Sequence, residues 1–135
     1  TSLPGSPAAG GISSAHDLIL FAQELLAPTL IDPITWDQAT SVQFPGTDGI
    51  LPGYGRQRPN DWGLGFEIRG AKDPHWTGPR ANPKTFGHFG QSGTFLWVDR
   101  AADLACVTLT DRDFGQWAVD VWSTYNQDIL DEFNV

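Results

Sequence analysis

The chain has 135 residues, 40% of them hydrophobic and 18% charged, which is enough for one compact domain and too little for two of ordinary size. The net charge of −8 argues against nucleic acids and anionic membranes as partners, and no apolar run reaches transmembrane length. The single cysteine, Cys106, cannot form an intrachain disulfide, and its apolar neighbours favour a buried core thiol.

Residues 1–43 are predicted to form a helical part. Apolar residues recur at helical spacing over 15–26, and Ser14 precedes them as an N-cap. Asp32 and Pro33 supply an N-cap and a first-turn proline for a second, shorter helix that ends near residue 40.

Residues 44–83 are predicted to be irregular loops with one short strand. Gly- and Pro-containing turn pairs dominate as far as Asn60, and residues 62–68 (WGLGFEI) are interpreted as the strand. Six of the eight cationic side chains lie between residues 56 and 84. We interpret them as a solvated loop surface, with guidance of an anionic substrate as the alternative.

Residues 84–135 are predicted to form a sheet covered by a helix. Three strands at about 84–91, 94–99 and 104–110 are separated by short turns, which favours an antiparallel meander. Apolar residues at helical spacing over 115–133 predict a helix whose stripe packs on one sheet face. The stripe consists of Trp117, Ala118, Val121, Trp122, Tyr125, Ile129 and Phe133.

These elements together predict an α+β fold within a single unit of residues 1–135. It would contain a three-stranded antiparallel sheet, a packed C-terminal helix and a short N-terminal helical pair. No internal repeat or low-complexity tract interrupts the sequence.

Three segments in the same order resemble the C-terminal region of the serine β-lactamase-like superfamily, which includes class C β-lactamases, penicillin-binding D-alanyl-D-alanine carboxypeptidases and esterases. They are Pro7–Leu18 (PAAGGISSAHDL), Trp62–Phe66 (WGLGF) and Phe86–Asp99 (FGHFGQSGTFLWVD). The third resembles the strand that carries the family's Lys-Thr-Gly motif. The resemblance implies part of the β-lactamase/transpeptidase-like fold and a location in the periplasm or cell envelope, with the cytoplasm as the alternative.

The resemblance also implies site residues. His88 occupies the lysine position of the Lys-Thr-Gly motif, and the backbone N–H of Gln91 matches half of the family's oxyanion hole. Phe89, Gly90 and Ser92 are the implied substrate-binding residues. Since Phe89 replaces the usual threonine, the site favours an esterase or peptidase-like specificity over β-lactamase activity.

Two family elements do not occur in the sequence. No serine has a lysine three residues further on, and neither tyrosine begins a Tyr-x-Asn triplet. We therefore expect the C-terminal portion of a serine hydrolase that acts on a lactam, peptide or ester carbonyl through an acyl-enzyme and is inactive alone. The sequence shows no metal-binding spacing of His or Cys, so we expect neither a metal nor a cofactor.

Two other functions stay open at this point. Six tryptophans and long Gly/Pro loops suit a stand-alone binding module, for example for carbohydrate, and a non-catalytic scaffold is the third possibility. The expected partner is a missing N-terminal half of the fold or a second copy of the chain. Either would pair with the apolar edge strand at 104–110, in addition to a small-molecule or peptide-like substrate in the intact enzyme.

Overall fold

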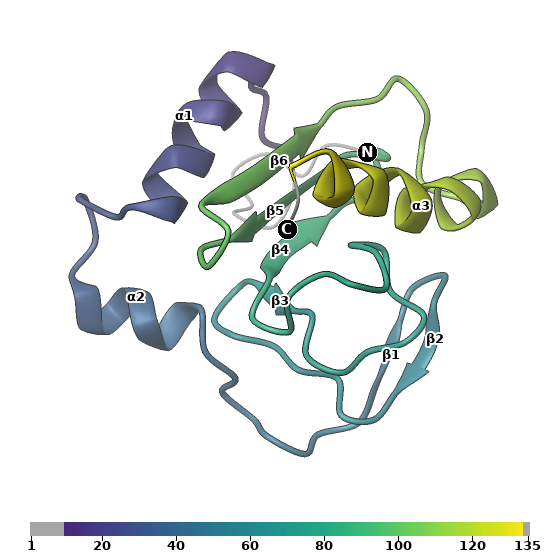
Figure 1. Ribbon diagram of the computed structural model, residues 1–135, viewed down its shortest axis with the longest axis horizontal. Coiled ribbons are helices and arrows are strands. Elements are labelled where there is room, and N and C mark those ends of the chain that lie inside the picture. Colours follow the sequence, from purple (N-terminus) through teal and green to yellow (C-terminus); the bar gives the residue numbers. More distant parts are fainter. Residues whose placement is uncertain (1–9, 134–135) are drawn as a thin grey trace.

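The computed structural model describes residues 10–133, which form three helices and six strands (Figure 1). The start of the first family segment, residues 7–9, lies outside the described residues. The elements are α1 (Ala15–Leu26), α2 (Pro33–Ala39), β1 (Gly49–Leu51), β2 (Gly55–Gln57), β3 (Glu67–Ile68), β4 (Phe86–Phe89), β5 (Phe95–Asp99), β6 (Leu104–Thr108) and α3 (Gln116–Glu132).

The two N-terminal helices begin where their caps predict. The Ser14 hydroxyl accepts a hydrogen bond from the Asp17 N–H at 3.2 Å, and the Asp32 carboxylate accepts from the Ile34 N–H at 2.9 Å. Each bond satisfies one of the donors that the first turn of a helix leaves free. The predicted helices at 15–26 and 33–40 are therefore confirmed to within a residue.

The main sheet has four antiparallel strands in the order β3-β4-β5-β6, where the sequence predicted three. In register, Glu67 of β3 lies opposite Gly87 of β4, and Gly87 lies opposite Trp97 of β5. The added strand is only Glu67–Ile68, so the predicted strand at 62–68 is mostly wrong.

The reason is a tight turn in the WGLGF segment. The Gly63 N–H donates to the Phe66 carbonyl at 2.8 Å, and Gly65 has a φ of 83°, which disfavours any side chain there. The Ala39 carbonyl oxygen at the end of α2 also approaches so closely that a Cβ on Gly63 would lie 2.0 Å from it. The two glycines therefore serve this turn and its packing on α2, and only the end of the segment joins the sheet.

A second correction concerns residues 44–60, which are not wholly irregular. β1 and β2 form a two-stranded antiparallel hairpin, with Leu51 paired to Gly55. Its turn is closed by a hydrogen bond from the Tyr54 N–H to the Leu51 carbonyl at 3.0 Å. Leu51 and Tyr54 are buried, so the hairpin contributes to the core.

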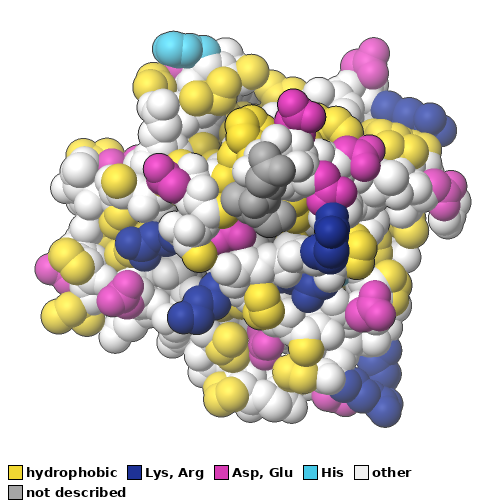
Figure 2. Space-filling view, in the orientation of Figure 1, with side chains coloured by type: hydrophobic (Ala, Val, Ile, Leu, Met, Phe, Trp, Pro, Cys, Tyr) yellow, Lys and Arg dark blue, Asp and Glu magenta, His cyan; other side chains and the backbone are white. Residues whose placement is uncertain are grey.

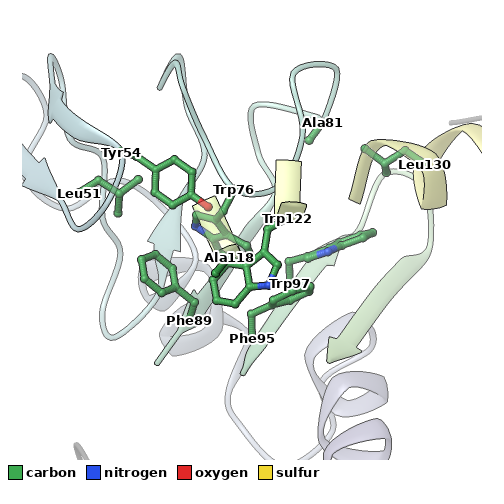
Figure 3. Packing of buried hydrophobic residues seen from close by; sticks show 10 residues of the cluster. All are labelled: Leu51, Tyr54, Trp76, Ala81, Phe89, Phe95, Trp97, Ala118, Trp122 and Leu130. Atoms are coloured by element: carbon green, nitrogen blue, oxygen red, sulfur yellow. The ribbon is translucent and has the colours of Figure 1, made fainter. Parts of the chain in front are cut away.

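Helices cover both faces of the main sheet, because alternate residues of β5 point into different apolar clusters. Phe95 and Trp97 pack with Trp122 of α3 in one cluster (Figure 3). Val98 packs with Leu25 of α1 in the other. The predicted packing of the C-terminal helix on one sheet face is confirmed, and α1 covers the opposite face (Figure 1).

The buried side of α3 differs from the predicted stripe. Its buried residues are Ala118, Trp122, Asn126 and Leu130, whereas Val121, Tyr125 and Phe133 are exposed. Asn126 lies in the core because its amide joins two buried groups: its Oδ1 accepts from the Trp97 indole N–H and its Nδ2 donates to the Trp76 carbonyl, both at 2.9 Å. An analysis of apolar spacing does not count a buried asparagine. The observed buried face of α3 therefore differs from the predicted apolar stripe.

Among residues 10–133, β6 pairs with β5 alone, so no strand lies beside its other edge. Within the same range no helix combines the length and apolarity needed to cross a bilayer.

Candidate functional site

The candidate site lies at the end of β4 and in the turn that leads to β5. His88 is exposed, and Phe89, whose side chain points to the other face, is buried. The Phe89 ring packs on Trp122 and Phe114, at ring-centroid distances of 5.6 and 4.9 Å. The Phe89 side chain therefore helps to hold the strand in place, while His88 faces outward.

The turn after Phe89 is held firmly. The Gly90 N–H donates to the Thr94 carbonyl at 2.9 Å, and the Gln91 carbonyl accepts from the Phe114 N–H at 2.8 Å. The exposed Ser92 hydroxyl lies 2.9 Å from the Thr94 hydroxyl. These bonds fix the direction of the backbone at Gln91, which is what an oxyanion-binding N–H requires.

Two features leave space at this turn. Within residues 10–133 the Gln91 backbone N–H meets no hydrogen-bond acceptor, so it is free to bind one from outside. A Cβ added to Gly90 would have no atom closer than 3.6 Å, which is ordinary van der Waals contact. Internal packing does not require a glycine there, unlike at Gly87, where a Cβ would lie 2.1 Å from the Leu96 carbonyl oxygen.

An apolar cavity of about 300 Å³ adjoins His88 and Gly90. Leu18 and Phe21 of α1 line it on one side. The sheet side is lined by Phe66, Phe89, Thr94, Phe95, Leu96 and Leu109. A larger cavity of about 640 Å³ lies near the start of β4 and includes none of the expected site residues.

A buried ionic cluster lies behind the site strands, and the sequence interpretation missed it. The Glu67 carboxylate accepts from the Lys72 ammonium at 3.1 Å, from His75 Nε2 at 3.0 Å and from the Trp76 indole N–H at 2.8 Å. Lys72 and Arg69 are both buried, so the predicted solvated surface for the cations of residues 56–84 is wrong at these two positions. Lys72 pairs with Glu67 and the Ile68 carbonyl, and Arg69 with the carbonyls of Gly70, Gly78 and Pro79, which are mainly backbone partners that a side-chain pattern does not reveal.

The protonation of His75 follows from its contacts. Its Nδ1 accepts a hydrogen bond from the Thr77 backbone N–H at 3.2 Å, so the proton of the neutral ring is on Nε2 and points at Glu67. Burial lowers the pKa of His75, more than the neighbouring Glu67 raises it. Burial alone would raise the pKa of Glu67, but the hydrogen bond from His75 and the charges nearby lower it overall.

Comparison with known proteins identifies the family. The β-lactamase family model matches residues 2–130, and the chain therefore belongs to the β-lactamase family. The crystal structure of a β-lactamase from Mycobacterium bovis is similar over 91% of this chain, with 58% identity and a TM-score of 0.87. An N-acetylmuramyl-L-alanine amidase of Bacillus subtilis strain 168 is 29% identical over 106 residues, or 77% of this chain.

The chain spans only part of these relatives. It covers 45% of the M. bovis structure and 22% of the B. subtilis amidase. The comparisons thus confirm the expected superfamily and the α+β class, together with a serine hydrolase relationship at the level of the family.

Proposed function

We propose that this chain forms one wall of the active site of a serine hydrolase that opens a lactam, peptide or ester carbonyl through an acyl-enzyme. The single observation that carries the proposal is the geometry of the β4–β5 turn. A free N–H at Gln91 lies next to the unobstructed Gly90 and the outward-facing His88, at the position of the family's Lys-Thr-Gly motif.

Each of these residues has a distinct role in the proposed reaction. When the nucleophile attacks the carbonyl, negative charge develops on its oxygen, and the Gln91 N–H donates a hydrogen bond to that oxygen. His88 borders the same space and orients the substrate or a neighbouring base. Gly90 lets the substrate backbone approach the strand, and Ser92 borders the site together with the backbone of Phe89, whose buried side chain holds the strand from the other face.

The nucleophile and its base come from outside the 135 residues, because the sequence holds neither Ser-x-x-Lys nor Tyr-x-Asn. By itself the chain supplies one oxyanion donor and no activated hydroxyl, so we expect it to be inactive alone. The proposed partner is the N-terminal half of the same fold, or failing that a second copy, joined through the β6 edge.

Apolar surface next to the site supports such a partner. Ile19, Leu20 and Phe21 of α1 are each about half exposed, at 49, 52 and 48%. In Figure 2 apolar side chains gather at the upper left, where Figure 1 places α1. Contiguous apolar surface of this kind usually marks a protein interface.

The apolar cavity beside His88 suits an apolar group on the acyl side of the substrate. Phe89 lacks the hydroxyl that often binds a substrate carboxylate in this family, which favours an ester or peptide substrate over a β-lactam. The amidase relative agrees with that preference, whereas the more similar M. bovis structure is named a β-lactamase, so the substrate assay decides between them.

The alternative of a Trp-rich binding module loses its support. It required exposed indole rings, whereas Trp36, Trp76, Trp97 and Trp122 are at most 2% exposed. Trp62 and Trp117 are half-buried. A row of exposed indole rings for stacking on sugars is therefore not present among residues 10–133.

A direct test assays the chain alone with a chromogenic cephalosporin and a short-chain nitrophenyl ester. We expect rates equal to buffer, and the same for His88→Ala. Turnover above buffer that disappears in the variant would contradict the proposal, because it would show that this chain holds its own nucleophile.

A further inference from the structure

The imidazole of His88 lies against an aromatic ring from outside the Lys-Thr-Gly-like strand. The Trp62 indole is 5.5 Å from it between ring centroids, with the planes at 70°. This edge-to-face arrangement is the one that aromatic quadrupoles favour. Because His88 is otherwise exposed, a neighbour that restricts its ring has a large effect on its orientation.

Trp62 is itself held by its backbone. Its carbonyl accepts from the Gln43 N–H at 2.9 Å, and an antiparallel bridge joins it to Glu67. The next residue, Gly63, packs directly on the Ala39 carbonyl. The indole therefore projects from a point that α2 and β3 fix together.

A buried cation also contacts the indole. The Lys72 ammonium is 5.9 Å from the centroid of the Trp62 ring, within the range of a cation–π contact. The carbonyls of Ile68 and Asp61 hold the ammonium at 2.5 and 2.7 Å, and Glu67 pairs with it at 3.1 Å. Lys72 is 1% exposed, so this contact is little weakened by water.

We propose that Trp62, backed by Lys72, is a positioning residue that sets the orientation of the His88 imidazole at the site. Trp62 acts through His88 and need not touch the substrate itself. This role rests on the proposed function of His88. It also gives the buried ionic cluster a role beyond stability, since the cluster holds Lys72 against the indole.

The first test measures the imidazole directly in this chain by NMR. An aromatic ring at this distance displaces the resonances of the His88 ring protons through its ring current. We expect Trp62→Leu, which keeps apolar bulk, to move these resonances, and Trp62→Phe to keep part of the displacement. Trp117→Leu removes a half-buried indole whose ring contacts are with Trp122 and Arg112, so it is the matched control and should leave the resonances in place.

The backing by Lys72 is tested with the double variant Glu67→Gln, Lys72→Met, which removes both buried charges at similar volume. We expect the His88 resonances to move in the direction seen for Trp62→Leu, by a smaller amount. Unchanged His88 resonances in a folded Trp62→Leu protein would overturn the proposal. If only the double variant leaves them unchanged, the role of Lys72 is wrong.

The second test uses activity. In a hybrid enzyme where this chain replaces the matching segment of the M. bovis relative, Trp62→Leu should lower kcat by roughly tenfold while KM stays nearly constant. Trp62→Phe should recover part of the loss. An unchanged kcat would overturn the functional role. A hybrid without any activity would instead contradict the proposed function, while the NMR result still decides whether the Trp62 ring lies against the His88 imidazole.

Discussion

Glu67 is the centre of the buried ionic cluster, since its carboxylate accepts hydrogen bonds from Lys72, His75 and Trp76. A buried carboxylate is tolerated only when its charge is matched and its oxygens are hydrogen-bonded. Both conditions hold here, and the arrangement assigns a neutral, Nε2-protonated ring to His75.

Stability should therefore fall in mild acid. Burial lowers the pKa of His75 in the folded chain. In the unfolded chain the His75 imidazole therefore binds a proton near pH 6.5, whereas in the folded chain it stays neutral at that pH. The free energy of unfolding should drop as pH falls below that value, with a slope of up to about 1.4 kcal/mol per pH unit. Below it, the lowered pKa of Glu67 adds a further loss as its carboxylate becomes protonated.

Urea unfolding at a series of pH values between 7.5 and 5 measures this slope. His75→Gln should flatten it, whereas His16→Gln, a change on the exposed start of α1, should leave it unaltered. An equal slope in the wild type and His75→Gln would contradict the assignment.

Gly90 tests the difference between a structural and a functional glycine. Because a Cβ fits there without a clash, Gly90→Ala should change the free energy of unfolding by less than about 0.5 kcal/mol. In the hybrid enzyme the same change should lower kcat/KM by roughly 10- to 100-fold, since the methyl group occupies the approach of the substrate. Gly87→Ala is the contrasting variant, and its clash with Leu96 should destabilise the fold. Full activity of Gly90→Ala would show that the substrate does not pass this strand.

At the scale of the elements, α3 is attached to the sheet by a polar residue inside an apolar interface. Asn126→Leu removes the partners of the Trp97 indole N–H and the Trp76 carbonyl. We expect a loss of about 2–4 kcal/mol, because two buried polar groups are left without hydrogen bonds. Denaturant unfolding compares it with Thr124→Ala on the exposed side of α3, which should cost little. A loss below about 1 kcal/mol would indicate that water replaces the amide.

The elements that the sequence predicted well are those with local signals. Ser14 and Asp32 begin their helices through contacts two or three residues away, and β4 to β6 alternate with short turns. A local sequence pattern is sufficient to predict these helices and strands, because the contacts that start or end them lie within a few residues.

The elements that it missed depend at least partly on distant contacts. The turn at residues 62–66 has a local part, the Gly63–Phe66 hydrogen bond and the positive φ of Gly65, and a distant part, the packing of Gly63 on the Ala39 carbonyl. The buried face of α3 differs from the apolar stripe because Asn126 is hydrogen-bonded to Trp97 and Trp76. The candidate site shows the same difference. The motif was sufficient to identify His88 and Gln91, whereas Trp62 comes near His88 only because β3 lies beside β4, which no spacing in the sequence reveals.

At the scale of the whole molecule, the unpaired edge of β6 is the feature that favours association with another chain. Its backbone groups on that side have no strand beside them among residues 10–133, and neither proline nor lysine guards the segment. We expect self-association at micromolar concentration, measured by light scattering. Val107→Lys, which places a charge on the edge strand, should shift the mass toward the monomer, while Thr124→Lys on α3 should not. A monomer whose mass is the same with and without the charge would rule the edge out as an interface.

The central claim is that residues of this chain complete a serine hydrolase site, and the hybrid enzyme tests it most directly. Residues 10–133 replace the matching segment of the M. bovis β-lactamase, which is 58% identical and contributes the rest of the fold. The measurement is kcat/KM on whichever substrate the parent enzyme hydrolyses, for the hybrid and its His88→Ala variant. We predict activity within about tenfold of the parent and a loss of roughly 100-fold or more in the variant. A folded hybrid that is inactive, or one that His88→Ala leaves untouched, would contradict the account.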